Sequence, residues 1–101
     1  MIVYNSTIKV DRVIESEWLI WQKNEQLPEI MRSGAFTEYK FYKLLATDDE
    51  GASTYVIQLF ATTAAHLDAY LKNFAPSMNE KAILKWGDQF VIFTTTMQVV
   101  N

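Results

Sequence analysis

The sequence predicts an α+β fold in which four strands form one antiparallel sheet and two helical segments cover the same face of it. Apolar residues recur with the spacing of a strand, a helix, two strands, a second helix and a last strand. This βαββαβ order is typical of the split βαβ arrangement. Proline and glycine residues fall between these segments, where the chain has to turn. The 101 residues contain no linker or repeat, so we expect a single domain over residues 1–101.

The strands are expected at Ile2–Val10, Phe36–Ala46, Ser53–Ala61 and Gln89–Val99. Alternation in the third strand puts an apolar row under the helices, namely Tyr55, Ile57 and Leu59. A more polar row then faces away in the first and third strands, namely Val3, Asn5, Thr7 and Lys9 with Thr54, Val56, Gln58 and Phe60. In the last strand the alternation is weak, and Phe90 and Ile92 are assigned to this second, mixed face. The alternation in the second strand does not show which of its two rows faces the helices.

The first helix is expected over Val13–Gln26, after Asp11 as a cap. Ile14, Trp18 and Trp21 share one stripe, and Glu25 continues it as a carboxylate. A separate short helical piece is expected over Pro28–Ser33, and Gly34 ends it with a positive φ.

The second helix is expected to begin after Thr63 as N-cap. Its apolar stripe repeats at i, i+3, i+4 and i+7 over Leu67, Tyr70, Leu71 and Phe74. Pro76 ends or kinks this helix, and Gly87 closes the piece that follows. The acidic stretch at residues 48–50, followed by Gly51, is expected to form a solvated hairpin turn, because it lacks the ligand spacing of a calcium loop.

Composition excludes several classes of function. The chain has no cysteine, so disulfides and thiolate metal sites are impossible. Its net charge is −3 with no basic cluster, which argues against binding of nucleic acid or of anionic membranes. No stretch reaches membrane-spanning length, and the first residues form a strand rather than a signal peptide. We therefore expect a cytoplasmic protein with no metal and no cofactor.

The mixed face of the sheet is too apolar to be left in water. Half of the residues are hydrophobic, and each large apolar side chain left exposed forgoes about 1.5–3 kcal/mol of burial. A second copy of the chain, packed sheet against sheet, covers this face best. The sequence thus predicts a homodimer that closes into a barrel with a cavity between the two sheets.

The chain resembles the dimeric α/β-barrel superfamily, a ferredoxin-like group. This group includes antibiotic-biosynthesis-type monooxygenases, muconolactone isomerases, YCII-like proteins and stress-response A/B-barrel proteins. Within or near it, the chain resembles a small uncharacterised bacterial family, through segments spread over the whole length: MIVYN at residues 1–5, WLIW at 18–21, LPEI at 27–30, SGAF at 33–36 and YVIQLF at 55–60. The resemblance implies a dimeric barrel and no assigned activity.

The same resemblance bears on cofactor chemistry. Haem degradation in this superfamily resembles a site of an asparagine, a tryptophan and an iron-ligating histidine. Asn5 matches the first position, whereas the other two fall near Phe60 or Ala61 and near Met78 or Asn79, so no axial ligand is present. The uncharacterised family often has a histidine before its Leu-Pro step, where this chain has Gln26.

The candidate ligand-binding residues are Asn5, Gln58, Phe60 and Thr94. Asn5 and Gln58 are amides on the mixed face, which orient a small ligand inside an apolar cavity. The alternative is that they bond to each other or to their mates across the dimer.

Three other features invite a functional interpretation. His66, the only histidine, is expected to face solvent near the helix cap. Glu25 is either a general base with a pKa raised by burial or a residue that reaches solvent or a lysine. The tryptophans Trp18, Trp21 and Trp86 are core or interface residues, unless aromatic walls hold a planar substrate.

Two functions compete. The first is a homodimeric small-molecule-binding or regulatory barrel without a catalytic motif. The second is a cofactor-independent monooxygenase or isomerase acting on a small aromatic or polyketide-like compound. An RNA-recognition module is excluded, because residues 53–60 contain neither glycine nor a basic residue. An amino-acid-binding regulatory domain is a remote alternative, because such domains usually have a glycine after the first strand and this chain has Asp11-Arg12-Val13.

Overall fold

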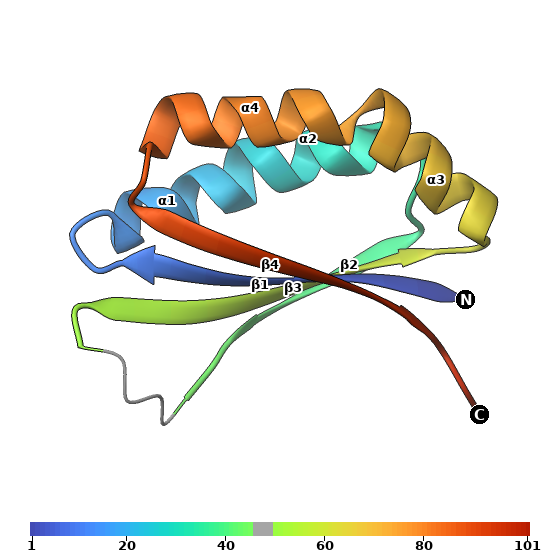
Figure 1. The fold of residues 1–101 in the computed structure, drawn as a ribbon, viewed down its shortest axis with the longest axis horizontal. Helices are drawn as coiled ribbons and strands as arrows, with labels where there is room; N and C mark the ends of the chain where they lie inside the picture. The colour runs from blue at the N-terminus through green and yellow to red at the C-terminus, as the bar shows by residue number, and fades with distance from the viewer. Residues whose placement is uncertain (46–49) are drawn as a thin grey trace.

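A four-stranded sheet forms one layer of the structure, and the helices form a second layer on one side of it (Figure 1). The computed structural model describes residues 1–45 and 50–101. The strands are β1 (Ile2–Asp11), β2 (Glu38–Lys43), β3 (Ala52–Ala61) and β4 (Phe90–Gln98). The helical segments are α1 (Glu15–Trp21), η1 (Gln22–Gln26), α2 (Leu27–Arg32), α3 (Ala64–Asn73) and α4 (Ala75–Trp86).

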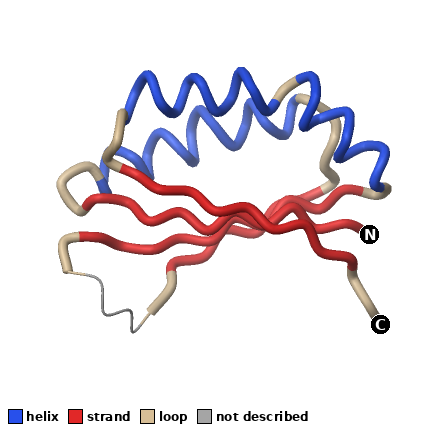
Figure 2. Tube along the Cα trace, viewed as in Figure 1, coloured by secondary structure: helices blue, strands red, loops and turns tan. Residues whose placement is uncertain are grey.

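The sheet has the order β2-β3-β1-β4, and all its neighbouring strands are antiparallel. Viewed from the side, both helical segments lie above the sheet, and no helix or strand of the described residues covers its lower face (Figure 2). The predicted α+β architecture with helices on one face is therefore confirmed.

The register of the central strands agrees with the predicted rows. Ser6 lies opposite Ile57 and Asn5 opposite Gln58. Tyr55, Ile57 and Leu59 are buried under the helices, as predicted. The mixed rows of β1 and β3 share the uncovered face, which we call the open face.

The assignment of the last strand was wrong. Antiparallel pairing sets Ile8 opposite Ile92 and Asn5 opposite Thr95. Phe90, Ile92 and Thr94 therefore lie on the helix side, while Val91, Phe93, Thr95 and Met97 lie on the open face. The strand carries apolar residues on both faces, so alternation does not distinguish its two rows. It is an edge strand that the helices cover only in part.

The first helical segment is continuous from Glu15 to Arg32, where the sequence predicted two pieces. Its middle turn, η1, is a π-helix: the backbone N–H of Leu27 bonds to the carbonyl of Gln22, five residues back. Pro28 follows directly in the first turn of α2. A π turn is wider than an α turn, which lets the chain pass the proline without ending the helix.

The π turn also explains why Glu25 does not continue the apolar stripe and instead reaches solvent, the second of its two predicted alternatives. One extra residue in this turn rotates everything after it by about 100° relative to a regular helix. Glu25 is therefore exposed, and Gln26 and Leu27 are buried in its place. The stripe that begins with Ile14 and Trp18 continues through them.

The second helical segment agrees with its predicted signals. Thr63 caps α3, and its hydroxyl accepts a hydrogen bond from the backbone N–H of His66. Phe74 separates α3 from α4, and Pro76 lies in the first turn of α4. Gly87 ends α4 with φ 61°. Of the predicted hairpin turn, Asp48 and Asp49 lie outside the described residues, whereas Gly51 has φ 75°.

Deleting Asn24 from the π turn tests its role as an extra residue. A regular helix would then keep Trp18, Gln22 and Gln26 on one face, so we expect a folded protein whose Tm is no lower than that of wild type. Circular dichroism during heating measures both properties.

The control is deletion of exposed Glu17 from the regular turn of α1. It rotates part of α1 away from the sheet, and we expect the Tm to fall by about 10 °C or more, as for loss of a large core side chain. If deletion of Asn24 lowers the Tm as much as deletion of Glu17 does, Asn24 does not act as an extra residue in the helix.

Candidate functional site

A cavity of about 530 Å³ lies between the helix layer and the sheet. Its floor comes from the helix-facing rows of β1, β3 and β4, and its roof from the two helical segments. The lining residues are Tyr4, Ser6, Ile8, Ile57, Leu59, Phe90, Ile92 and Thr94 on the sheet side, and Trp18, Trp21, Gln22, Gln26, Ile30, Tyr70, Ala75, Met78, Asn79, Ala82, Ile83 and Gly87 on the helix side. We call it the helix–sheet cavity.

Among the described residues, no charged side chain lines the helix–sheet cavity. Its walls are aromatic and aliphatic, with a few amides and hydroxyls among them. Because burial of an unpaired charge is costly, such a cavity suits an uncharged molecule. Apolar walls with a small number of polar groups are typical of small-molecule sites.

The cavity opens between α4 and β4. Four of its lining residues are exposed there, two from each element: Asn79 and Ile83 on α4, Ile92 and Thr94 on β4. The opening exists because β4 is an edge strand that the helices cover only in part. A ligand therefore has a direct path from solvent to the cavity.

Two amides from the π turn line the cavity, one from each end of η1. Gln26 is buried, and its Nε2 donates a hydrogen bond to the backbone carbonyl of Met78 at 3.1 Å. Gln22 is 5% exposed, and its Oε1 has no hydrogen-bond partner within the described structure. The indole Nε1 of buried Trp86, whose ring packs edge-on against Trp21 5.8 Å away, lacks a partner as well.

The phenol of Tyr70 adds a neutral polar group to the cavity wall. Burial raises the pKa of Tyr70 to about 12. The hydroxyl therefore stays protonated at neutral pH and adds no charge.

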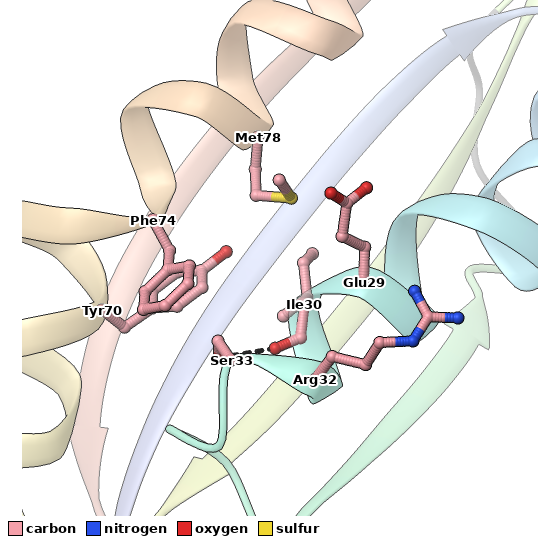
Figure 3. A pocket seen from close by; sticks show the side chains of 7 residues that line it. All are labelled: Glu29, Ile30, Arg32, Ser33, Tyr70, Phe74 and Met78. Carbon is pink, nitrogen blue, oxygen red and sulfur yellow. Dashed lines mark hydrogen bonds between the residues drawn. The ribbon is translucent and has the colours of Figure 1, made fainter.

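A smaller hollow of about 280 Å³ lies beside the cavity, between α2 and the junction of α3 with α4 (Figure 3). It shares Ile30, Tyr70 and Met78 with the helix–sheet cavity. At its rim Glu29 forms an ion pair with Lys81 at 2.5 Å. Both side chains are more than 40% exposed, so this pair contributes little to stability.

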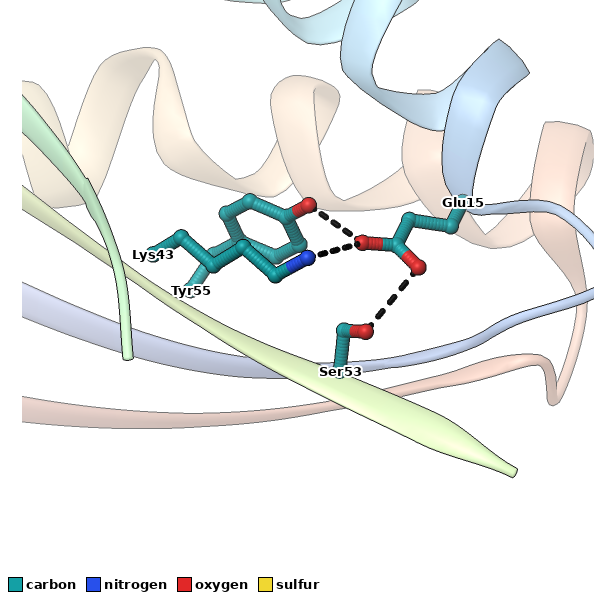
Figure 4. A network of polar contacts seen from close by, with 4 residues as sticks. All are labelled: Glu15, Lys43, Ser53 and Tyr55. Carbon is teal, nitrogen blue, oxygen red and sulfur yellow. Dashed lines mark hydrogen bonds and ion pairs between the residues drawn. The ribbon is translucent and has the colours of Figure 1, made fainter. Parts of the chain in front are cut away.

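A polar network fastens the start of α1 to the sheet (Figure 4). The carboxylate of Glu15 accepts hydrogen bonds from the hydroxyls of Ser53, at 2.9 Å, and Tyr55, at 2.5 Å. Lys43 lies 3.2 Å from the same carboxylate. The hydrogen bond from Tyr55 is the main reason why the pKa of Glu15 is lowered, and burial raises the pKa of Tyr55. These groups satisfy one another and lie outside the cavity lining, so the network is structural.

The four candidate residues from the sequence lie on two different faces. Asn5, Gln58 and Phe60 lie on the open face, where Asn5 and Gln58 are register partners. The amide of Asn5 donates a hydrogen bond to the hydroxyl of Thr7 at 3.4 Å. Thr94 lies on the other face, at the mouth of the helix–sheet cavity. A ligand site between two sheets needs a second copy of the chain and stays a prediction.

The sequence reasoning missed Gln22 and the helix–sheet cavity. A regular period of 3.6 residues per turn places Glu25 on the buried stripe and Gln22 beside that stripe. The available signal was the proline at position 28, three residues after the expected stripe ends. His66 is exposed, and its Nδ1 lies 2.7 Å from the cap hydroxyl of Thr63, which confirms the prediction for it.

The described residues lack two features that are relevant to function. They contain no group of three or more histidine, aspartate or glutamate side chains that could hold a metal ion. None of their helices is long and apolar enough to cross a membrane.

Comparison with known proteins supports both the fold and the family resemblance. The profile of a family described as a domain of unknown function, DUF4286, matches residues 1–100. No protein with curated information matches the chain.

Three solved structures illustrate the structural similarity. HapK from Hahella chejuensis has a TM-score of 0.73 at 12% identity, over 99% of this chain and 93% of HapK. A dimeric ferredoxin-like protein from an uncultured marine organism has a TM-score of 0.71 at 12% identity, over 99% and 95% of the two chains. A candidate antibiotic biosynthesis monooxygenase from Deinococcus radiodurans has a TM-score of 0.66 at 10% identity, over 100% and 94%. The ferredoxin-like α+β fold predicted from the sequence is confirmed.

Replacing Tyr55 by phenylalanine tests the network that fastens α1. The hydroxyl is lost and the ring stays, so we expect a loss of about 1.5–3 kcal/mol of unfolding free energy at neutral pH, the range for hydrogen bonds to charged groups. Since the folded-state pKa of Glu15 is depressed, the contribution is present above the ordinary value of 4.5 and is lost as the pH falls through the folded-state pKa.

Urea unfolding of wild type and Tyr55→Phe at neutral pH and near pH 3 measures this difference. It should shrink in acid, and a difference that does not depend on pH would contradict the assignment to Glu15. Tyr39→Phe, at an exposed position of β2, is the control and should change stability by less than about 0.5 kcal/mol.

Proposed function

We propose that this chain, which belongs to the DUF4286 family of unknown function, acts as a homodimer that binds a small uncharged molecule in the helix–sheet cavity. The proposal makes the protein a binding or regulatory module.

The observation that supports this proposal is an open cavity whose described lining is uncharged and includes an unsatisfied polar atom. A fold that only needed a core would fill a space of about 530 Å³ with side chains, since protein interiors are close-packed. Buried polar groups are nearly always hydrogen-bonded, yet Gln22 Oε1 in the cavity wall has no partner among the described residues. A ligand accounts for both features.

The open face supports the proposed homodimer. Val91, Phe93 and Met97 of β4 expose apolar side chains on this face, which also carries Val3, Val56 and Phe60. The uncultured marine protein with the same fold is dimeric, and a closed two-fold pair would cover this face without leaving an unpaired surface. Asn5 and Gln58 would then meet their mates from the second copy.

A second candidate function is a cofactor-independent monooxygenase or isomerase. The similarity to a candidate antibiotic biosynthesis monooxygenase and the aromatic cavity walls favour it. The two functions differ in turnover: a molecule that co-purifies with the protein stays unchanged on a binding module during aerobic incubation, and an enzyme converts it. Mass spectrometry of the extracted molecule before and after incubation distinguishes the two.

Blocking the mouth of the cavity tests ligand binding. We expect wild type to bind the uncharged fluorescent probe N-phenyl-1-naphthylamine, and Thr94→Trp to bind it at least about tenfold more weakly, because the indole would occupy the opening. Fluorescence titration measures both affinities.

The matched control is Leu84→Trp, at an exposed position of α4 outside the cavity lining. It should bind the probe as wild type does. Equal binding by wild type and Thr94→Trp would place the probe elsewhere and remove the support for this cavity as the site.

A charge on the open face tests the dimer. Phe93 is 67% exposed in the single chain, and burying an unpaired carboxylate there is costly. We therefore expect wild type to be a dimer and Phe93→Asp a folded monomer by light scattering after size-exclusion chromatography. Val13→Asp, in the turn between β1 and α1, should stay dimeric, and a monomeric wild type at micromolar concentration would refute the proposal.

A further inference from the structure

Gln22 is a buried side chain whose amide oxygen lacks a partner in the described structure. Only 5% of the residue is exposed, and its buried Oε1 atom accepts no hydrogen bond from the described residues. Such an acceptor loses its hydration on folding and regains nothing, which destabilises the protein. An unsatisfied group of this kind in a cavity wall needs an explanation.

The local backbone shows that this placement depends on η1. Gln22 is the first residue of the π turn and Gln26 the last, and both line the helix–sheet cavity. Gln26 is already engaged with the Met78 carbonyl, which ties the first helical segment to α4. The two amides therefore differ in role: Gln26 holds the roof together and Gln22 is left available. Single π turns are frequent at functional sites.

The chemistry of the walls limits what Gln22 can meet. A carboxamide oxygen only accepts hydrogen bonds, so its partner must be a donor. The other described lining groups include no ionised side chain, and Tyr70 stays protonated because burial raises its pKa to about 12. A charged ligand would find no counter-charge in this cavity.

We infer that Gln22 determines the specificity of the helix–sheet cavity, by accepting a hydrogen bond from a hydroxyl or N–H group on an otherwise apolar, uncharged ligand. This inference rests on the proposed binding function. A resident water molecule would satisfy Gln22 equally, but it would give no preference among ligands that differ only in their polar group.

Three naphthalene derivatives with different polar groups test the inference. 2-Naphthol donates a hydrogen bond, 2-methoxynaphthalene only accepts, and 2-naphthoate is charged at neutral pH. We expect wild type to bind 2-naphthol about tenfold more tightly than the methyl ether, and 2-naphthoate most weakly. Isothermal titration calorimetry gives the three affinities.

The matched variant is Gln22→Met, which keeps the length and helix propensity of the side chain. We expect it to bind the methyl ether as well as 2-naphthol. A preference for 2-naphthol that survives in Gln22→Met, or one that is missing in wild type, overturns the assignment of Gln22 and leaves the binding function standing. Failure of wild type to bind any of the three compounds overturns both.

The stability of the two glutamine variants without ligand is a second readout. Gln22→Met removes an unsatisfied acceptor, so its Tm should equal or exceed that of wild type. Gln26→Met leaves the Met78 carbonyl without its donor, so its Tm should fall. A lower Tm for Gln22→Met would mean that Gln22 has a structural partner and is not free for a ligand.

Discussion

The extra residue in the π turn determines what the first helical segment presents to the sheet. With it, the buried side of the segment passes from Trp18 to Gln26 and Leu27, and Glu25 points to solvent. In a regular helix the same residues would direct a carboxylate at the apolar floor, and that burial would be costly. The turn therefore keeps the helix–sheet cavity uncharged and also brings two amides into its wall.

Contacts beside the helix–sheet cavity hold the helix layer in place, and the space next to them stays open. At one end Glu15 is bonded to Ser53 and Tyr55, and the rings of Trp18 and Tyr55 pack 5.2 Å apart. Elsewhere Gln26 ties the π turn to α4 through the Met78 carbonyl. Between these contacts, the partly covered edge strand β4 forms the mouth. Specific contacts around an open space are the arrangement that a preformed binding site requires.

Much of the fold could be predicted from the sequence, because the apolar spacing and the caps of each helix or strand depend only on residues close together in the chain. Leu67 and Tyr70 lie on the predicted stripe, and Thr63 and Gly87 bound the second helical segment as expected. The site could be predicted less well. The face of Thr94 depends on the pairing of β4 with β1, which is a long-range property that an edge strand with two apolar rows does not reveal. The position of Gln22 depends on the wider π turn, and a pattern search that assumes 3.6 residues per turn does not detect it.

Native mass spectrometry of gently purified protein tests the central claim most directly, because it reports subunit number and retained small molecules together. Our account predicts a dimer of the 11.7 kDa chain that carries a small neutral molecule, or takes up 2-naphthol when it is supplied. The bound mass should be lost on denaturation. A dimer that stays free of ligand even in the presence of 2-naphthol would contradict the binding function, and a monomer would contradict the account of the open face.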